Sequence, residues 1–173
     1  DFAKRYGLYK TWIDRYLVES IGERTPRSLY RPVRYVLAGG GKRIRPVLVL
    51  ASCAAVGGRA VDALHAGAAI EILHNFTLVH DDIMDNAESR RGRMTVHRRW
   101  DTNVAILVGD ELLARAYRTL LRTRSPRIRE ITRDFTEGVV EVCEGQAYEK
   151  EFEARLRVTV NDYLLMIRKK TGK

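Results

Sequence analysis

Residues 61–86 read VDALHAGAAIEILHNFTLVHDDIMDN, and this stretch decides the fold class that the sequence predicts. Its apolar residues recur at steps of three and four, which is the spacing of one face of an α-helix. The recurring positions are Ala69, Ile72, Phe76, Val79 and Ile83. The pattern therefore predicts one long helix over about residues 61–86, with three aspartates near its end.

Those aspartates, Asp81, Asp82 and Asp85, indicate a metal site. On a helix Asp81 and Asp85 share a face, with Asp82 about 100° round from Asp81. The negative end of the helix makes each carboxylate unfavourable by up to about 1 kcal/mol unless a cation offsets it. Carboxylate oxygens are ligands that suit Mg²⁺. The alternative interpretation is an acidic, solvated end of a helix.

Composition predicts one domain and favours an anionic partner. A length of 173 residues with 45% hydrophobic content suits a single core, so we expect one domain over residues 1–173. The net charge of +9 favours nucleic acid, an anionic membrane or phosphorylated small molecules. Cys53 and Cys143 have no disulfide or metal spacing, so we expect a reduced, cytoplasmic protein. The sequence shows no apolar run of the roughly 18 residues that a transmembrane helix needs, and no apolar signal core.

The rest of the chain is predicted to be helical. No stretch alternates with the period of two that a half-buried strand requires, so the predicted fold class is all-α. Thr102 is the predicted N-cap of one helix. The highly charged residues 149–157 are expected to be mobile. Further helices are predicted over residues 2–21, 26–37, 46–56, 102–120 and 128–142, and from about residue 160.

Residues 39–46 read GGGKRIRP and indicate a phosphate-binding segment. Glycines followed by cations stand at the start of a predicted helix, where free backbone N–H groups and the positive helix end favour an anion. Lys42 and Arg45 are spaced to face the same way. The spacing is not that of a P-loop, and no strand precedes it. The alternative is a glycine helix stop followed by solvated cations.

Other side chains could line the same site. His74 lies two helical turns before Asp81, about 10.5 Å along the same face, although a histidine in an apolar helix more often packs in the core. Arg90 and Arg91 can each form bidentate bonds to phosphate oxygens, or can face solvent in an RRG turn. A cation and a hydroxyl near the end of the chain are supplied by Lys170 and Thr171.

The joint order of these motifs is more specific than any one of them. GGGKRIRP, ILHNFTLVHDDIMD, RRGRMTVH, GQ and KTG closely resemble the trans-isoprenyl diphosphate synthases, the family of farnesyl and geranylgeranyl diphosphate synthases. The resemblance covers most of residues 35–173. It implies a helical bundle around a deep central cavity, a homodimer, and the Mg²⁺-dependent condensation of isopentenyl diphosphate with an allylic diphosphate.

The resemblance also implies residue roles. Mg²⁺, and through it the allylic diphosphate, would be bound by Asp81, Asp82 and Asp85. The allylic diphosphate would also be held by Arg90, Lys170 and Thr171. Isopentenyl diphosphate would be held by Lys42, Arg45, His74 and Arg91. Gln146 would lie beside the reacting carbons.

The resemblance further suggests what limits the product. Phe76 lies roughly 7.5 Å deeper along the helix than Asp81 and resembles the aromatic stop of short-chain members, with the small Thr77 beside it. No residue is inserted between Asp82 and Asp85, so we expect a C15 or C20 product, with C20 favoured. The alternative is that Phe76 only packs in the core.

The sequence departs from the family pattern at three places. The family has a second aspartate-rich motif further along, whereas this sequence reaches Lys173 without one, so we expect an amino-terminal portion of a synthase. Met94 stands where relatives usually have proline. Glu149 stands where an aspartate often follows the GQ segment.

Other functions fit parts of the sequence. An HD-type phosphohydrolase would bind a metal through His80 and Asp81 with His65 or His74, but it leaves the other aspartates unexplained, and such a site prefers transition metals. A non-catalytic partner subunit of a synthase is disfavoured by the intact first motif. Nucleic-acid binding is disfavoured because the basic residues are dispersed.

Overall fold

The computed structural model describes residues 1–172, which form two compact units, one over Asp1–Arg124 and one from Ser125 onward. The all-α fold class is confirmed. The prediction of one domain over residues 1–173 stays a prediction, and Lys173 lies outside the described residues. The first unit contains α1 (Phe2–Glu19), α2 (Arg27–Leu37), α3 (Ile44–Ala55), the 3₁₀ helix η1 (Ala60–Ala63), α4 (Leu64–Met84), α5 (Val96–Arg99) and α6 (Thr102–Leu120). The second contains α7 (Ile128–Glu153) and α8 (Val160–Thr171).

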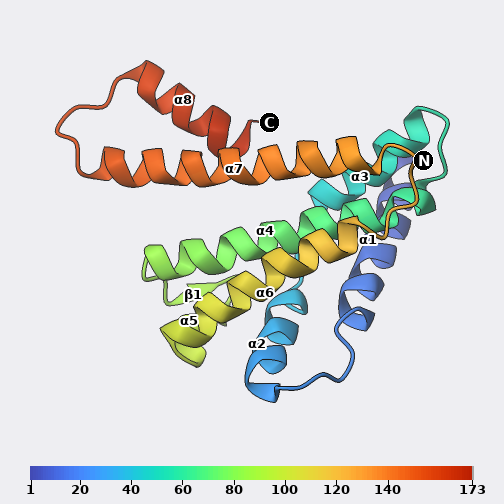
Figure 1. Ribbon diagram of the computed structural model, residues 1–173, viewed down its shortest axis with the longest axis horizontal. Helices are drawn as coiled ribbons and strands as arrows, with labels where there is room; N and C mark the ends of the chain where they lie inside the picture. Colours follow the sequence, from blue (N-terminus) through green and yellow to red (C-terminus); the bar gives the residue numbers. More distant parts are fainter. Residues whose placement is uncertain (173) are drawn as a thin grey trace. The chain divides into compact units, whose positions relative to one another are not determined.

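Helix α4 is the centre of the first unit. It lies beside α6 along much of its length (Figure 1) and also packs against α3 and α1. The predicted apolar stripe is the buried face, since Ala69, Ile72, Phe76 and Val79 are all buried. The α4–α6 contact is close because α6 has a glycine, Gly109, opposite His80. The carboxylates at the end of α4 therefore stand on a helix that its neighbours hold firmly.

The structure corrects two local predictions. Asp101, not Thr102, is the N-cap of α6, because its Oδ1 accepts a hydrogen bond from the backbone N–H of Val104 over 2.8 Å. Helix α3 begins at Ile44 rather than at residue 46. Residues 149–153 continue α7, and the mobility predicted for residues 149–157 stays a prediction.

The sequence analysis expected no strand, and the structure contains a small β-hairpin. Strands β1 (Ser89–Arg90) and β2 (Arg93–Met94) pair antiparallel. Two-residue strands are too short to show an alternating pattern. Arg91 and Gly92 between them have φ of 53° and 73°, and positive φ at both central residues is what a type I′ turn requires. The hairpin turns the chain back after α4.

In the second unit, α8 packs back against α7. A capping box starts α8, with Thr159 Oγ1 accepting from the N–H of Asp162 and Asp162 accepting from the N–H of Thr159. Gly145 permits the close approach, since a Cβ there would lie 2.5 Å from the backbone nitrogen of Lys170. None of the helices in the described residues has the length and apolar character needed to cross a bilayer.

Candidate active site

Three aspartates stand at the end of α4, and they differ in burial. Asp81 is half-buried, Asp82 is buried, and Asp85 is the exposed C-cap residue. The backbone N–H of Asp85 donates to the carbonyl oxygen of Asp81 over 2.8 Å, so the helical geometry continues as far as Asp85. Asp81 and Asp85 therefore lie one turn apart on the same side of the helix end.

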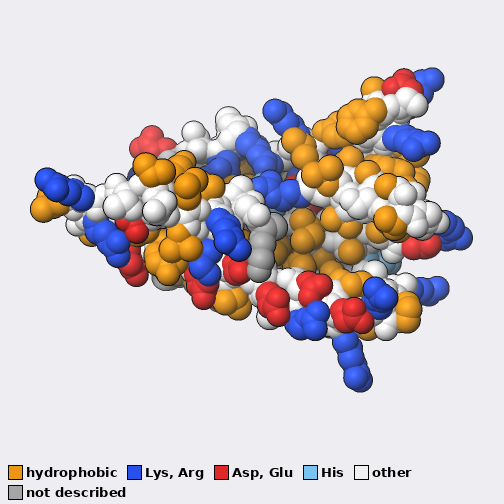
Figure 2. Space-filling view, turned by 90° about the horizontal axis from the view of Figure 1, so that it is seen from above, with side chains coloured by type: hydrophobic (Ala, Val, Ile, Leu, Met, Phe, Trp, Pro, Cys, Tyr) orange, Lys and Arg blue, Asp and Glu red, His pale blue; other side chains and the backbone are white. Residues whose placement is uncertain are grey.

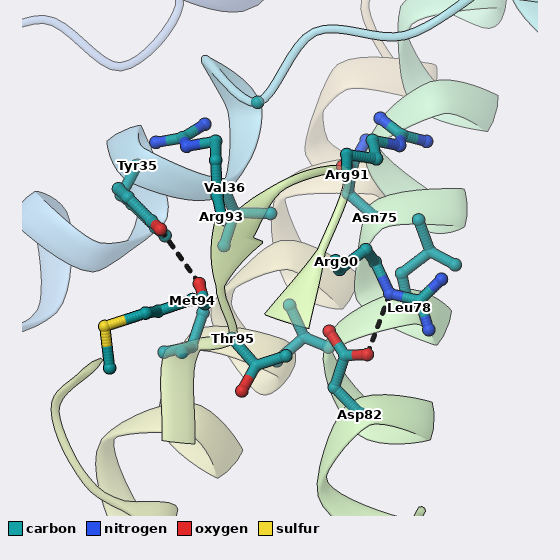
Figure 3. Close-up of a pocket in the computed structure, with 13 residues that line it drawn as sticks. Tyr35, Val36, Asn75, Leu78, Asp82, Arg90, Arg91, Arg93, Met94 and Thr95 are labelled. Atoms are coloured by element: carbon teal, nitrogen blue, oxygen red, sulfur yellow. Dashed lines mark hydrogen bonds and ion pairs between the residues drawn. The ribbon is translucent and has the colours of Figure 1, made fainter. Parts of the chain in front are cut away.

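The middle aspartate is engaged by an arginine of the hairpin. Arg90 Nε donates to Asp82 Oδ1 over 2.8 Å, as Figure 3 shows. Burial raises the pKa of the Asp82 carboxyl, and the hydrogen bond and charge of Arg90 act to lower it. The side chain of Asp82 is 8% exposed and that of Arg90 is 38% exposed. The pair therefore fixes Arg90 while part of its guanidinium faces solvent.

The hairpin that carries Arg90 is held against α2. Tyr35 Oη donates to the carbonyl oxygen of Met94 over 2.8 Å (Figure 3). The guanidinium of Arg93 lies over the Tyr35 ring, 3.8 Å from its centroid. Thr95 Oγ1 donates to the carbonyl oxygen of Ala87 over 2.7 Å, which closes the base of the hairpin. These contacts fix the direction in which the hairpin arginines point.

Arg91, in the turn of the hairpin, reaches the glycine-rich loop, a name we use for residues 39–45, which include the first two residues of α3. Its Nη1 donates to the carbonyl oxygen of Gly40. A Cβ on Gly41 would lie 2.8 Å from the same nitrogen, and the φ of 148° at this position favours glycine. The structure thus brings together the GGGKRIRP and RRG motifs, which lie about 50 residues apart.

Cations converge on His74. The pKa of His74 is lowered to about 4, first because burial disfavours the charged ring and then because Arg45, Arg91, Arg90 and Arg43 add positive charge nearby. The ring is therefore neutral at pH 7. Guanidinium groups gathered in this way repel one another, and a polyanionic ligand would relieve that repulsion.

The loop exposes two further cations. Lys42 and Arg45 are both exposed, and neither has an ion pair within the described residues. The charge of Arg45 acts on His74. These side chains are available to an anionic ligand approaching the loop.

A small pocket of about 60 Å³ lies between α2, α4 and the hairpin (Figure 3). Tyr35, Asn75, Asp82, Arg90 and Arg91 are among the residues that line it. Ligand clefts are usually of roughly 300–1,000 Å³. The pocket beside the Asp82–Arg90 pair therefore has room for water or a small polar group and is too small for a prenyl chain.

The two residues predicted to limit the product lie on different sides of α4. Thr77 stands one turn before Asp81, and its Oγ1 donates to the carbonyl oxygen of His74 over 2.9 Å. Phe76 is buried and contacts the His80 ring, with centroids 4.7 Å apart. Phe76 therefore packs in the core of the unit, and its effect on product length stays a prediction.

The remaining predicted residues belong to the second unit. Gln146 follows Gly145 at the close contact of α7 with α8, and its Nε2 is buried without a hydrogen-bond partner among the described residues. Lys170 pairs with Glu149, the residue that departs from the family aspartate. Thr171 is the last residue of α8 and is exposed. Their approach to Asp81 stays a prediction.

The donor set at the end of α4 fits Mg²⁺ shared with a ligand. Mg²⁺ is usually held by one or two carboxylates together with phosphate oxygens and water. Asp81 and Asp85 supply two carboxylates, whereas one oxygen of Asp82 is taken by Arg90. Over residues 1–172 no group of three or more His, Cys, Asp or Glu side chains is placed to hold a metal ion. An ion here would need oxygens from a bound diphosphate to complete its coordination.

The sequence alone did not reveal the contacts that hold the glycine-rich loop in place. The sequence distinguished Arg43 only as one cation of the GGGKRIRP segment, whereas the structure shows it buried and paired with Glu71 and Asp14. Tyr6 Oη donates to the carbonyl oxygen of Lys42, which ties α1 to the loop. The one available signal was Glu71 itself, a carboxylate inside an apolar helical stretch, which requires a buried partner.

The rival functions gain no support from the structure. His80, which an HD-type site would use with Asp81, packs its ring against Phe76 and Gly109 instead of pointing to the carboxylates. Lys and Arg side chains project from many points of the face seen in Figure 2, with acidic and apolar side chains between them. A dispersed charge of this kind does not resemble a nucleic-acid surface.

The fold defines the class of protein, because solved isoprenoid synthases share it. The geranylgeranyl pyrophosphate synthetase of the archaeon Geoglobus acetivorans superposes with a TM-score of 0.93 at 43% identity, covering 96% of this chain and 55% of that one. The geranylgeranyl pyrophosphate synthetase of Pyrococcus horikoshii superposes with a TM-score of 0.93 at 42% identity, covering 99% and 54%. The all-α fold is therefore of the isoprenoid-synthase type.

The chain belongs to the polyprenyl synthetase family, whose profile matches residues 26–173. A short chain isoprenyl diphosphate synthase of Methanothermobacter thermautotrophicus is 44% identical over 165 residues, which cover 95% of this chain and 51% of that protein. The geranylgeranyl pyrophosphate synthase of Geoglobus acetivorans is 45% identical over 163 residues, which cover 92% and 51%. The chain spans about half the length of these curated relatives.

Proposed function

We propose that the protein is a short-chain trans-prenyltransferase that condenses isopentenyl diphosphate with an allylic diphosphate to give a C15 or C20 prenyl diphosphate. One observation carries the proposal: the cations of the glycine-rich loop and the hairpin converge on His74, on the helix that ends in the carboxylates. Family membership and the 44–45% identity to short-chain and geranylgeranyl synthases support it.

Isopentenyl diphosphate would bind to the basic side of the site. Lys42 and Arg45 are exposed on the loop, and Arg91 is held against the same loop. His74 is neutral at pH 7, so one ring N–H can donate to a phosphate oxygen without adding charge. The diphosphate charge would offset the repulsion among the guanidinium groups.

The allylic diphosphate would bind at the end of α4. Asp81 and Asp85, with Asp82 as a further proposed ligand, would hold Mg²⁺, which when bound neutralises the departing diphosphate. Arg90, fixed by Asp82, would stabilise the charge that develops on the leaving oxygens. From the family resemblance we propose that Lys170 and Thr171 also bind the allylic diphosphate and that Gln146 lies beside the reacting carbons.

The reaction then needs no protein nucleophile. The C–O bond of the allylic diphosphate breaks, and the allylic carbon becomes carbocation-like. The π electrons of isopentenyl diphosphate form the new C–C bond, and loss of one proton gives a product longer by five carbons. The protein has to exclude water from the cation, because water would trap it as an alcohol.

We also propose a product length, an oligomeric state and a cellular location for the protein. Phe76, with Thr77 beside it, would limit the chain to C15 or C20, with C20 favoured. A homodimer is proposed from the family resemblance, and the exposed Ile106 and Leu107 on α6 are apolar surface that a second copy could cover. A cytoplasmic location is supported by the two free cysteines, Cys53 and Cys143.

The test is product formation. The full-length protein is incubated with Mg²⁺, isopentenyl diphosphate and dimethylallyl, geranyl or farnesyl diphosphate in separate reactions, and the products are sized by chromatography after removal of phosphate. The proposal expects a Mg²⁺-dependent C15 or C20 product. Absence of an elongated product with every allylic substrate would contradict it.

A further inference from the structure

Arg43 is a buried cation in a loop whose other cations face solvent. It follows Lys42 and stands two residues before Arg45, both of which are exposed. The side chain of Arg43 is only 3% exposed. A charged side chain is this strongly buried only when partners satisfy it.

The partners of Arg43 come from the helices around the loop. Nε donates to Asp14 Oδ1 on α1 over 2.8 Å, and Nη1 donates to Glu71 Oε1 on α4 over 2.6 Å. Nη2 lies 3.4 Å from the carbonyl oxygen of Leu37 at the end of α2. Glu71 is also only 3% exposed. One guanidinium therefore fastens the loop to α1, α2 and α4 together.

A buried ion pair of this kind is weak evidence for a stabilising role. The loss of hydration often cancels the attraction, and replacing both partners by apolar side chains of similar volume is often neutral for stability. What the pair does supply is a defined geometry. The function of the Arg43–Glu71 pair is therefore to position neighbouring groups.

The backbone conformation at Arg43 determines where its neighbours Lys42 and Arg45 point. Its φ is 52°, in the left-handed region, which costs a residue with a side chain roughly 1–2 kcal/mol. Two carbonyl groups that precede Arg43 are also held, since Tyr6 Oη donates to the carbonyl oxygen of Lys42 and Arg91 Nη1 donates to that of Gly40. Turning Arg43 inward in this conformation leaves Lys42 and Arg45 on the outer face of the loop.

The partner on α4 sets the position of the loop relative to the rest of the site. Glu71 lies one turn before His74 and Asn75, and Asn75 Nδ2 donates to the Glu71 carbonyl oxygen over 2.7 Å. The Arg43–Glu71 pair thus joins the loop to the same helix that presents His74 and Asp81.

We infer that Arg43 is a positioning residue, which holds Lys42 and Arg45 in register with His74 so that together they receive the diphosphate of isopentenyl diphosphate. The inference rests on the proposed function for the identity of that ligand. Arg43 itself does not touch the ligand, since its donors are directed to Asp14, Glu71 and Leu37.

The test separates positioning from stability in the full-length protein. Arg43→Met should raise the KM for isopentenyl diphosphate about 10- to 100-fold, because misplacing binding groups by about 1 Å costs this much. The KM for the allylic diphosphate should stay essentially unchanged. In the double variant Arg43→Met with Glu71→Met, the melting temperature should recover while the raised KM persists. Arg43→Lys keeps the charge but not the several N–H donors of the guanidinium group, so it should give an intermediate KM for isopentenyl diphosphate.

A second buried arginine provides the matched control. Arg115 on α6 is 2% exposed, pairs with Glu111, and donates to the carbonyl oxygen of Ser20 over 3.1 Å, away from the loop. Arg115→Met should lower the melting temperature without a selective change in the KM for isopentenyl diphosphate. Recovery of both melting temperature and KM in the Met/Met double variant, or equal changes in the KM of both substrates, would overturn the inference.

A binding measurement separates this inference from the proposed function. Inorganic pyrophosphate is titrated into the wild-type protein and the Met/Met double variant without Mg²⁺. If the wild type makes no product but the double variant binds pyrophosphate at least about tenfold more weakly, the proposed function fails and the positioning role stands. If pyrophosphate binding is the same in both proteins, the positioning role fails.

Discussion

The Nε atom of Arg90, on β1, lies 2.8 Å from Oδ1 of Asp82, the middle aspartate of α4. The aspartate-rich motif therefore holds an arginine, in addition to the metal binding proposed for it. Asp82 is buried, whereas Asp85 is exposed and Asp81 is half-buried. The three aspartates are thus placed for different tasks, which substitution can separate.

Asp81→Asn should reduce kcat/KM at least about 100-fold and raise the Mg²⁺ concentration needed for half-maximal activity, because a metal ligand is lost. Asp82→Asn should mainly raise the KM for the allylic diphosphate, about tenfold, because a charged hydrogen bond to Arg90 is weakened. The measurement is initial rate against Mg²⁺ and against substrate. An equal shift in Mg²⁺ requirement for both variants would instead support Asp82 as a direct ligand.

Phe76→Ala should lengthen the products by one or more five-carbon units, because the side chain proposed to block the growing chain is removed. The variant should also lose up to about 3–5 kcal/mol of stability, since Phe76 is buried. Product sizing with farnesyl diphosphate as the primer measures the effect. Leu17→Ala, at a fully buried position of α1, is the control: it should lower stability and leave the products unchanged. Unaltered products from Phe76→Ala would exclude it as the stop.

His74 should make the protein less stable in mild acid. Its folded pKa of about 4 lies below the ordinary histidine value of 6.5, so between these values the unfolded chain binds more protons than the folded one. The contribution of the neutral His74 ring to the free energy of unfolding is fully present above about pH 6.5 and is lost as the pH falls toward 4. His74→Gln should reduce the slope of unfolding free energy against pH in this window, by at most about 1.4 kcal/mol per pH unit. Urea unfolding at several pH values measures it, and an unchanged slope would contradict the placement of cations around His74.

Gly109→Ala should destabilise the contact between α4 and α6. A Cβ at this position would lie 2.0 Å from Nε2 of His80, so the His80 ring or one of the helices has to shift, at a cost of roughly 1–3 kcal/mol. Gly7→Ala in α1 is the matched control, because a Cβ there meets no atom of the described residues within 4 Å, and it should stabilise by about 0.5–1 kcal/mol. Thermal unfolding distinguishes the two. If adding His80→Ala to Gly109→Ala restored no stability, the clash would not be the cause.

The local patterns predicted α4 well, and for a physical reason. Its apolar stripe faces α6 and α3, so burial dictates the spacing from Ala69 to Val79. The position of Asp81 and Asp85 one turn apart then follows from helix geometry alone. The ends of helices were less predictable, as Asp101 and Thr102 show: both residue types can cap, and backbone geometry selects the aspartate.

The long-range contacts of the site could not be predicted in this way. Arg43 and Arg45 look alike in the sequence, yet one is buried against Glu71 and the other is exposed. The difference arises from a left-handed residue in the loop, which no periodicity reveals. The pairing of Arg90 with Asp82 likewise depends on a two-residue turn that reverses the chain.

The central claim is that the chain presents separate binding places for two diphosphates, one basic and one rich in carboxylates. Equilibrium titration of the full-length protein with isopentenyl diphosphate, and separately with a non-reactive allylic diphosphate analogue, tests it directly, with and without Mg²⁺. The account predicts that isopentenyl diphosphate binds without the metal and loses affinity in Lys42→Met, whereas the allylic analogue requires Mg²⁺ and loses affinity in Asp81→Asn. If neither diphosphate bound, or if both depended on the same residue and on Mg²⁺ alike, the account would be contradicted.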